Sequence, residues 1–145
     1  MRARLHAANR RDDGFTLIEL LVVIVIIGIL AATAIPVFLS EKHRGYEASM
    51  KSDVRTVAKE MDTYFVDNQT YPATTEVTAS SGHVTVGTGG TVITLSAGNT
   101  ITATHAGANG YCLHVVSSLT SATYDYDSQA GGLQPKNTGC PSTSY

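Results

Sequence analysis

The 145-residue sequence contains no tryptophan, and aromatic residues make up only 7% of it. Charged residues are also scarce, at 15%, and 10 Lys and Arg nearly balance 12 Asp and Glu. A chain of this length forms about one domain, which excludes a multidomain enzyme. The near-neutral balance gives neither a broad basic surface nor an acidic tail. No direct nucleic-acid binding is therefore expected.

One long stretch, from Leu20 to Leu39, contains no charged residue at all. Twenty residues in a helix rise about 30 Å, the thickness of the hydrocarbon core of a bilayer. The stretch therefore predicts a membrane-spanning helix. Four arginines within the first eleven residues precede it, and such residues keep a leader on the cytoplasmic side.

Behind this stretch, apolar residues recur at steps of three and four with charged residues between them, the pattern of an amphipathic helix. Nothing between Leu39 and Tyr46 forces a break, so one helix is expected from about Phe15 to about Asp67. Pro36 lacks a backbone donor and is expected to kink it. The apolar positions are Tyr46, Met50, Val54, Val57, Met61 and Tyr64 or Phe65.

The second half of this helix carries five basic residues that could contact lipid phosphate or DNA. Acidic residues alternate with them, which predicts a face of salt bridges instead. The basic residues are Lys42, Arg44, Lys51, Arg55 and Lys59, and the acidic ones are Glu41, Glu47, Asp53 and Glu60.

The last half of the chain is rich in Thr, Ser and Gly, which disfavours helix and suits short strands and turns. Short connections favour an antiparallel meander, and Gly98-Asn99 predicts a tight hairpin within it. The expected fold class is α+β, with the long helix packed on a small sheet of about four strands. The strands are expected among the segments 83–86, 91–97, 100–105, 111–118 and 122–128.

The two cysteines, Cys112 and Cys140, are an even count beside an export-type segment, which favours a disulfide over two free thiols. Such a bond would close a 29-residue loop and form outside the cytoplasm. His114 lies close to Cys112 in the sequence, but no second Cys or His pair completes a zinc set at the usual spacing.

Glu19 stands where the apolar segment begins. A carboxylate in a membrane segment is costly, so it is usually retained for a reason. A Glu in the first turn of a helix also stabilises the helix dipole, which makes simple capping the alternative.

The string GFTLIELLVVIVIIGILAATAIPVFL, residues 14–39, resembles the type IV pilin and pseudopilin family. The resemblance implies that a membrane aspartyl peptidase cuts between Gly14 and Phe15 and then methylates the new amino group of Phe15. It also implies that Glu19 meets the N-terminal amine of an adjacent subunit during assembly, and that Pro36 has a structural role in the filament. Cys112 and Cys140 resemble the C-terminal disulfide loop of many pilins.

The resemblance divides the chain into four parts. These are a cleaved leader 1–14, a transmembrane and filament-core helix 15–39, an amphipathic helix 40–70, and a β head 71–145 with the disulfide loop 112–140. The precursor would wait in the cytoplasmic membrane with its head outside, and the processed subunit would enter a cell-surface pilus. The implied partners are other copies of the chain, the prepilin peptidase, and a pilus assembly platform with its ATPase.

We therefore expect a structural pilus subunit, not an enzyme, with no cofactor. The nearest alternative is a pseudopilin of a type II secretion or DNA-uptake system, although the disulfide loop favours a pilin. An alternative of another class is a secreted binding domain whose residues 1–34 are a signal peptide, because Ala32-Thr33-Ala34 fits the small-x-small cleavage rule. A membrane-anchored hydrolase has no supporting motif.

Asp125 and Asp127 are weak calcium candidates. Two carboxylates fall short of the usual six to eight oxygen ligands, so exposed turn residues are the expected role of this pair.

Overall fold

The computed structural model describes residues 14–142 and 145, so residues 1–13 of the expected leader lie outside the described residues. The chain divides into two compact units, one ending at Leu39 and the other comprising Ser40–Tyr145. Helix α1, Leu17–Asn68, contributes to both. Its bounds confirm the predicted helix to within two residues, and the helix continues past Pro36.

In the first unit, the part of α1 from Leu17 to Leu39 exposes its large apolar side chains. Their exposed fractions run from 46% at Leu21 to 83% at Leu17. The helix is long and apolar enough to cross a membrane. Exposed apolar surface on this scale needs lipid or protein to cover it.

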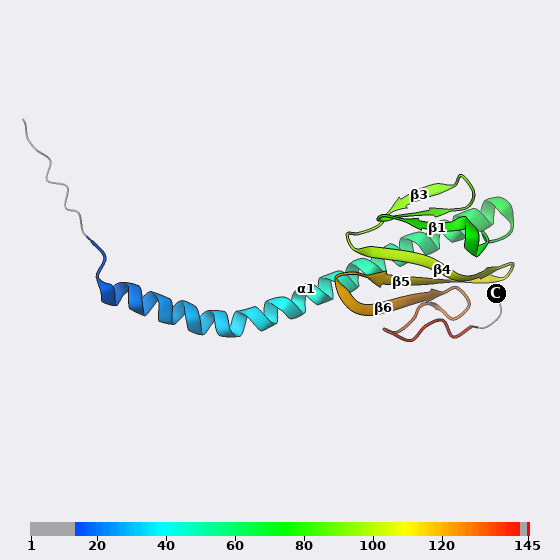
Figure 1. Ribbon diagram of the computed structural model, residues 1–145. Helices are drawn as coiled ribbons and strands as arrows, with labels where there is room; N and C mark the ends of the chain where they lie inside the picture. Colours follow the sequence, from blue (N-terminus) through cyan, green and yellow to red (C-terminus); the bar gives the residue numbers. More distant parts are fainter. Residues whose placement is uncertain (1–13, 143–144) are drawn as a thin grey trace, which may run out of the picture. The chain divides into compact units, whose positions relative to one another are not determined.

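The second unit is a head in which seven strands and a short 3-10 helix pack against the rest of α1 (Figure 1). The strands form two antiparallel meanders, β1-β2-β3 and β4-β5-β6-β7. The α+β class with a long helix on an antiparallel head is confirmed, but the expected count of about four strands is too low, because the head has seven in two sheets. The elements are η1 Thr74–Glu76, β1 Val77–Ser80, β2 His83–Val86, β3 Thr91–Thr94, β4 Asn99–Gly107, β5 Gly110–Ser117, β6 Thr120–Asp127 and β7 Gly132–Leu133.

The predicted hairpin at Gly98-Asn99 is also wrong, because β3 and β4 belong to different sheets. The chain turns at Gly98, whose φ of 83° lies in the left-handed region that glycine adopts without strain. It then leaves the first sheet. Asp53 of α1 explains the change of direction. Its carboxylate accepts hydrogen bonds from the Ser96 N–H at 2.8 Å and from the Asn99 side-chain amide at 2.8 Å.

The core lies between α1 and the two sheets. Its helix side is the predicted apolar stripe, because Met50, Val54, Val57 and Met61 are all fully buried. Deleting such side chains to alanine costs about 2–5 kcal/mol each. The sheets contribute Val77, Val84, Val86, Ile101, Tyr111, Leu113, Val115, Ala122 and Tyr124.

Polar bonds tie the second sheet to α1 at two further points. The Tyr111 hydroxyl donates to the Ala58 carbonyl at 2.9 Å and to the Asp62 carboxylate at 3.0 Å, and burial raises the pKa of Tyr111. The Glu47 carboxylate accepts the Tyr124 hydroxyl at 2.8 Å and also Lys136. These bonds position the sheet along the helix more specifically than apolar contact alone does.

Candidate functional site

The start of α1 is built by a reciprocal pair of side chains, Thr16 and Glu19. The Glu19 Oε2 atom accepts hydrogen bonds from the Thr16 N–H at 2.9 Å and the Thr16 hydroxyl at 2.8 Å. The Thr16 hydroxyl in turn accepts the Glu19 N–H at 3.3 Å. This is a capping box, in which two otherwise unpaired backbone donors are satisfied.

The capping box does not use the whole carboxylate. Both bonds to Thr16 end on Oε2, so Oε1 keeps its capacity to accept a hydrogen bond from a cation. Glu19 can therefore cap its own helix and bind a second group at the same time. The two sequence interpretations of Glu19 are compatible with each other.

The expected cleavage point lies directly before this cap. Phe15 is 90% exposed, and a Cβ added at Gly14 would have no atom within 4 Å in the described part of the chain. The Gly14–Phe15 peptide bond is thus accessible from the Phe15 side, and a larger residue at 14 would meet no obstacle among the described residues.

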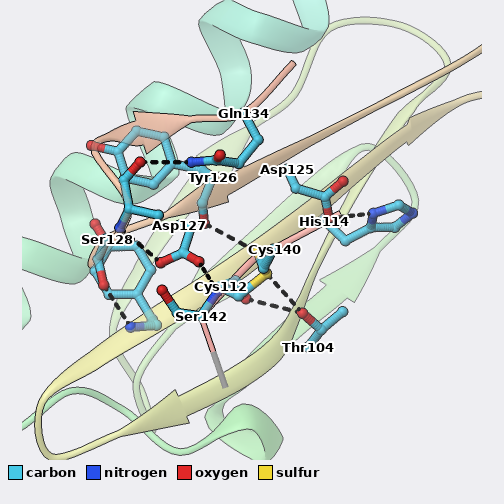
Figure 2. The surroundings of a disulfide bond; sticks show 12 residues. Thr104, Cys112, His114, Asp125, Tyr126, Asp127, Ser128, Gln134, Cys140 and Ser142 are labelled. Atoms are coloured by element: carbon cyan, nitrogen blue, oxygen red, sulfur yellow. Dashed lines mark hydrogen bonds and ion pairs between the residues drawn. A yellow bond between two sulfur atoms is a disulfide. The ribbon is translucent and has the colours of Figure 1, made fainter. Parts of the chain in front are cut away.

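In the head, the disulfide joins Cys112 of β5 to Cys140 in the segment after β7, with 6.2 Å between their Cα atoms. Beside it lies Asp127, a fully buried residue of β6 (Figure 2). Its carboxylate accepts the N–H groups of Gln129 and Ser142, each at 2.9 Å, and the Tyr145 hydroxyl at 3.0 Å. Disulfide and carboxylate together hold the C-terminal segment on the sheet.

Asp125 and Asp127 are not the exposed turn residues that the sequence predicts. They lie two residues apart on β6, so they share one face, and they are only 3% and 0% exposed. One Asp125 oxygen bonds to His114 Nδ1 at 2.8 Å, while Oδ2 has no partner among the described residues (Figure 2).

This donor set fits calcium poorly. Asp127 already accepts four hydrogen bonds, and calcium prefers six to eight oxygen ligands. Cys112, Asp125 and Cys140 also lie close enough together to surround a metal ion, but both sulfur atoms belong to the disulfide. Neither group supports a metal site in the oxidised head.

Asp127 is expected to make the stability of the head depend on pH. Burial alone would raise the pKa of Asp127, but hydrogen bonds from Ser142, Gln129 and Tyr145 outweigh it and lower the pKa below the usual value of 3.8. A carboxyl whose pKa is lower in the folded state stabilises that state above its unfolded pKa. This contribution is lost as the pH falls through the folded pKa.

Asp127→Asn is therefore expected to lower the free energy of unfolding by about 2 kcal/mol at pH 7 and by much less at pH 2. Denaturant titration of the full chain in detergent at the two pH values measures both differences. Ser128→Ala, which removes the hydroxyl bonded to the Tyr111 N–H, is the control without a titrating group. An equal loss for Asp127→Asn at both pH values would contradict the assignment.

The predicted salt-bridged face of α1 is largely wrong. Within the described residues, the helix contains one intrahelical ion pair, Arg44 to Glu41 at 3.2 Å. Glu47 pairs instead with Lys136 of the C-terminal segment, and Lys51 lies 4.6 Å from the centre of the Tyr124 ring. Tertiary partners displaced the local pairs because the head covers that side of the helix.

Sequence reasoning missed the polar anchors Asp53, Asp62 and Glu47. Each bonds to a residue at least 43 positions away, so no local spacing indicates them. The Tyr and Asn partners lie in strands whose sheet arrangement the sequence did not predict.

Comparison with known proteins adds to this geometry. Residues 9–35 match the model of the prokaryotic N-terminal methylation motif. Type II secretion system core protein G of Pseudomonas aeruginosa is 42% identical over 66 residues, which are 46% of this chain and 46% of that protein. The protein of the same name from Escherichia coli K12 is 38% identical over 69 residues, 48% of each chain.

The matched segment thus spans just under half the length of these relatives. The motif covers the capped start of α1 and most of its apolar part, and the head has the α+β pilin fold described above. The motif, the relatives and the fold are together consistent with the type IV pilin and pseudopilin family, which this chain resembles.

Proposed function

We propose that this chain is a pseudopilin, a structural filament subunit that serves a type II secretion system and catalyses no reaction. The observation that carries the proposal is the 38–42% identity to type II secretion core protein G relatives, together with the methylation motif. The sequence interpretation placed a pilus subunit first and a pseudopilin second. The relatives favour the second.

The subunit would exist in two environments. Before assembly the apolar part of α1 spans the cytoplasmic membrane, with the four-arginine leader inside and the head outside. In the filament the same exposed apolar side chains, from Leu17 to Leu39, pack against those of neighbouring copies. One surface serves both states, because packing between helices can replace contact with lipid.

Cleavage of the leader would supply a cationic partner for the Glu19 carboxylate. Hydrolysis of the Gly14–Phe15 bond creates an amine at Phe15, and this amine stays cationic after methylation. The free Oε1 of Glu19 in one copy would accept a hydrogen bond from the Phe15 amine of its neighbour. In surroundings of low dielectric constant this attraction is stronger than in water, and it fixes the register between adjacent helices.

The proposed partners follow from this cycle. They are other copies of the chain, a prepilin peptidase that cuts and methylates, and the assembly platform of the secretion machinery with its ATPase. The proposed location is the cytoplasmic membrane for the precursor and the periplasm for the assembled pseudopilus.

A pilus subunit is the second candidate, and the disulfide between Cys112 and Cys140 favours it. Deleting the gene distinguishes the two. A pseudopilin deletion is expected to stop the release of secreted enzymes into the medium and to leave surface pili in place. Loss of surface pili with normal secretion would contradict the pseudopilin proposal and support the pilus.

Replacing Gly14 by valine is expected to leave at least 90% of the chain uncut in the membrane, because a branched side chain would not fit the peptidase subsite. No atom of residues 14–142 or 145 obstructs a side chain there, so folding of the head should not change. Immunoblotting of membrane fractions measures the ratio of precursor to processed chain. Gly14→Ala is the matched control and should be cut, and efficient cutting of Gly14→Val would count against the proposed site.

A further inference from the structure

The charged side chains of the head fall into two groups. Most have a partner within the described residues, such as Arg44 with Glu41 and Lys136 with Glu47. Four, all on α1, have no ion pair, hydrogen bond or ring contact there: the cations Arg55 and Lys59 and the anions Glu60 and Asp67. Two positive and two negative charges are thus left over.

The two cations share one face of the helix. Arg55 and Lys59 are four residues apart, about 6 Å along the axis, and both are exposed. They line an open hollow of about 420 Å³ whose other walls are the short side chains of Ala48, Ser52 and Thr56. We call this surface the basic face, and its small residues allow another molecule to approach the helix closely.

The two anions lie on a different face. Glu60 and Asp67 are seven residues apart, two helical turns, and line a groove of about 330 Å³ between α1 and the connection from β2 to β3. Thr88, on the opposite wall, donates a hydrogen bond to Glu76 at 2.9 Å, so a third carboxylate adds to the negative field. We call this surface the acidic groove.

We propose that the acidic groove binds the basic face of a second copy of this chain, with Arg55 and Lys59 of one head beside Glu60 and Asp67 of the next. The proposal rests on the proposed function and adds a specific contact between heads. Charge complementarity is its basis. The basic face carries the two unpaired cations, and the acidic groove carries the two unpaired anions.

The positions of the two surfaces determine the kind of assembly. On a helix with 3.6 residues per turn, Arg55 and Lys59 lie roughly a third of a turn from Glu60 and Asp67. One copy can therefore use both surfaces at once, each with a different neighbour. Such a head-to-tail contact need not close on itself, and it continues into an open helical filament.

A charge-exchange experiment tests the contact in the full chain, in cells that lack their own copy of the gene but keep the rest of the assembly machinery. One variant, Glu60→Lys with Asp67→Lys, is basic on both surfaces. The other, Arg55→Glu with Lys59→Glu, is acidic on both. Each alone is expected to give at most one tenth of the wild-type amount of filament. Co-expression of the two is expected to restore at least half, because each then meets a complementary neighbour.

The co-expressed pair is its own control for folding, since both variants are present in it, and the Cys112–Cys140 disulfide can be checked by mass. Wild-type amounts of filament from either variant alone, or no recovery from the pair, would overturn the contact while leaving the proposed function in place. A wild-type chain that forms no filament at all would instead remove the proposed function itself.

A zero-length carbodiimide cross-link provides an independent measurement on wild-type filaments. The reagent joins the Lys59 amine to the Asp67 carboxylate as an amide and takes up the water that is lost. These residues are eight positions apart on one helix, about 12 Å along the axis, too far to be joined within a copy. Filaments grown from ¹⁴N- and ¹⁵N-labelled subunits should yield the mixed-isotope Lys59–Asp67 peptide, and its absence would contradict the contact.

Discussion

Glu19→Ala is expected to leave the chain processed in the membrane but to reduce filament by at least tenfold. In the proposed assembly the Glu19 carboxylate binds the Phe15 amine of a neighbour, and alanine removes that partner. The amine would then be placed among apolar helices as an unpaired cation, which costs several kcal/mol. Sheared or overproduced filaments, quantified by immunoblot against total subunit, provide the measurement.

The capping box requires a second variant, because Glu19→Ala also removes the hydrogen bonds to Thr16. Glu19→Gln separates the two roles: glutamine serves in a capping box but carries no charge. Thr16→Val is the matched control, since it removes the Thr16 hydroxyl from the box and leaves the carboxylate charged.

The pairing account predicts that Glu19→Gln assembles as poorly as Glu19→Ala, while Thr16→Val assembles nearly normally. The capping account predicts that Thr16→Val assembles worse than Glu19→Gln, because the threonine variant weakens the start of the helix by about 1 kcal/mol while glutamine keeps the cap. Normal filaments from Glu19→Gln would therefore contradict the role of the charge.

Removing the disulfide has the second large expected effect. Cys112→Ser with Cys140→Ser is expected to lower the free energy of unfolding of the head by about 3.5 kcal/mol, from the entropy of closing a loop of this length. The loop contains β6 and β7, and Cys140 holds the segment that brings Ser142 and Tyr145 to Asp127. Loss of the bond should therefore loosen the whole C-terminal segment.

Urea titration of the full chain in detergent, with and without reductant, measures this effect. The wild type under reducing conditions should resemble the double serine variant, and reductant should not change that variant further. Thr104→Val is the matched control, because it removes a hydroxyl that lies 3.0 Å from Cys112 Sγ and leaves the disulfide intact. Unchanged stability of the double variant would show that the tail is held by hydrogen bonds alone.

The parts of the fold that depend on local pattern were predictable. The apolar stripe from Met50 to Met61 is a repeat of three and four residues, and the structure buries it. The short connection between β4 and β5 joins paired antiparallel neighbours, as the predicted meander requires. In both cases the signal lies within about a dozen residues, which is the range over which periodicity and turn chemistry operate.

The features that the sequence did not predict depend on distant contacts. The Gly98-Asn99 turn has hairpin residues, but Asp53 binds Ser96 and Asn99 across more than 40 positions and directs β4 into a second sheet. β7 is only two residues long, which is too short for alternation to distinguish it from a loop. Asp127 is buried because backbone N–H groups donate hydrogen bonds to its carboxylate. Amino-acid composition does not predict these hydrogen bonds.

The same distinction applies to the candidate site. The motif around Gly14, Phe15 and Glu19 is contiguous, so it could be found from the sequence and is matched by the methylation-motif model. The basic face and the acidic groove could not be found from the sequence. Their charges were expected to pair along the helix, and they emerge as unpaired only once the head has supplied partners for Glu47 and Lys51.

The most direct test of the central claim, that this chain is processed into a filament subunit, is the mass of its N-terminal peptide and of the intact chain, both from isolated filaments or membranes. The account predicts a chain that begins at N-methylated Phe15 and is two hydrogens lighter for the Cys112–Cys140 disulfide. A chain that begins at Ile35 would contradict it, because the apolar helix would then have been removed as a signal peptide and no filament core would remain.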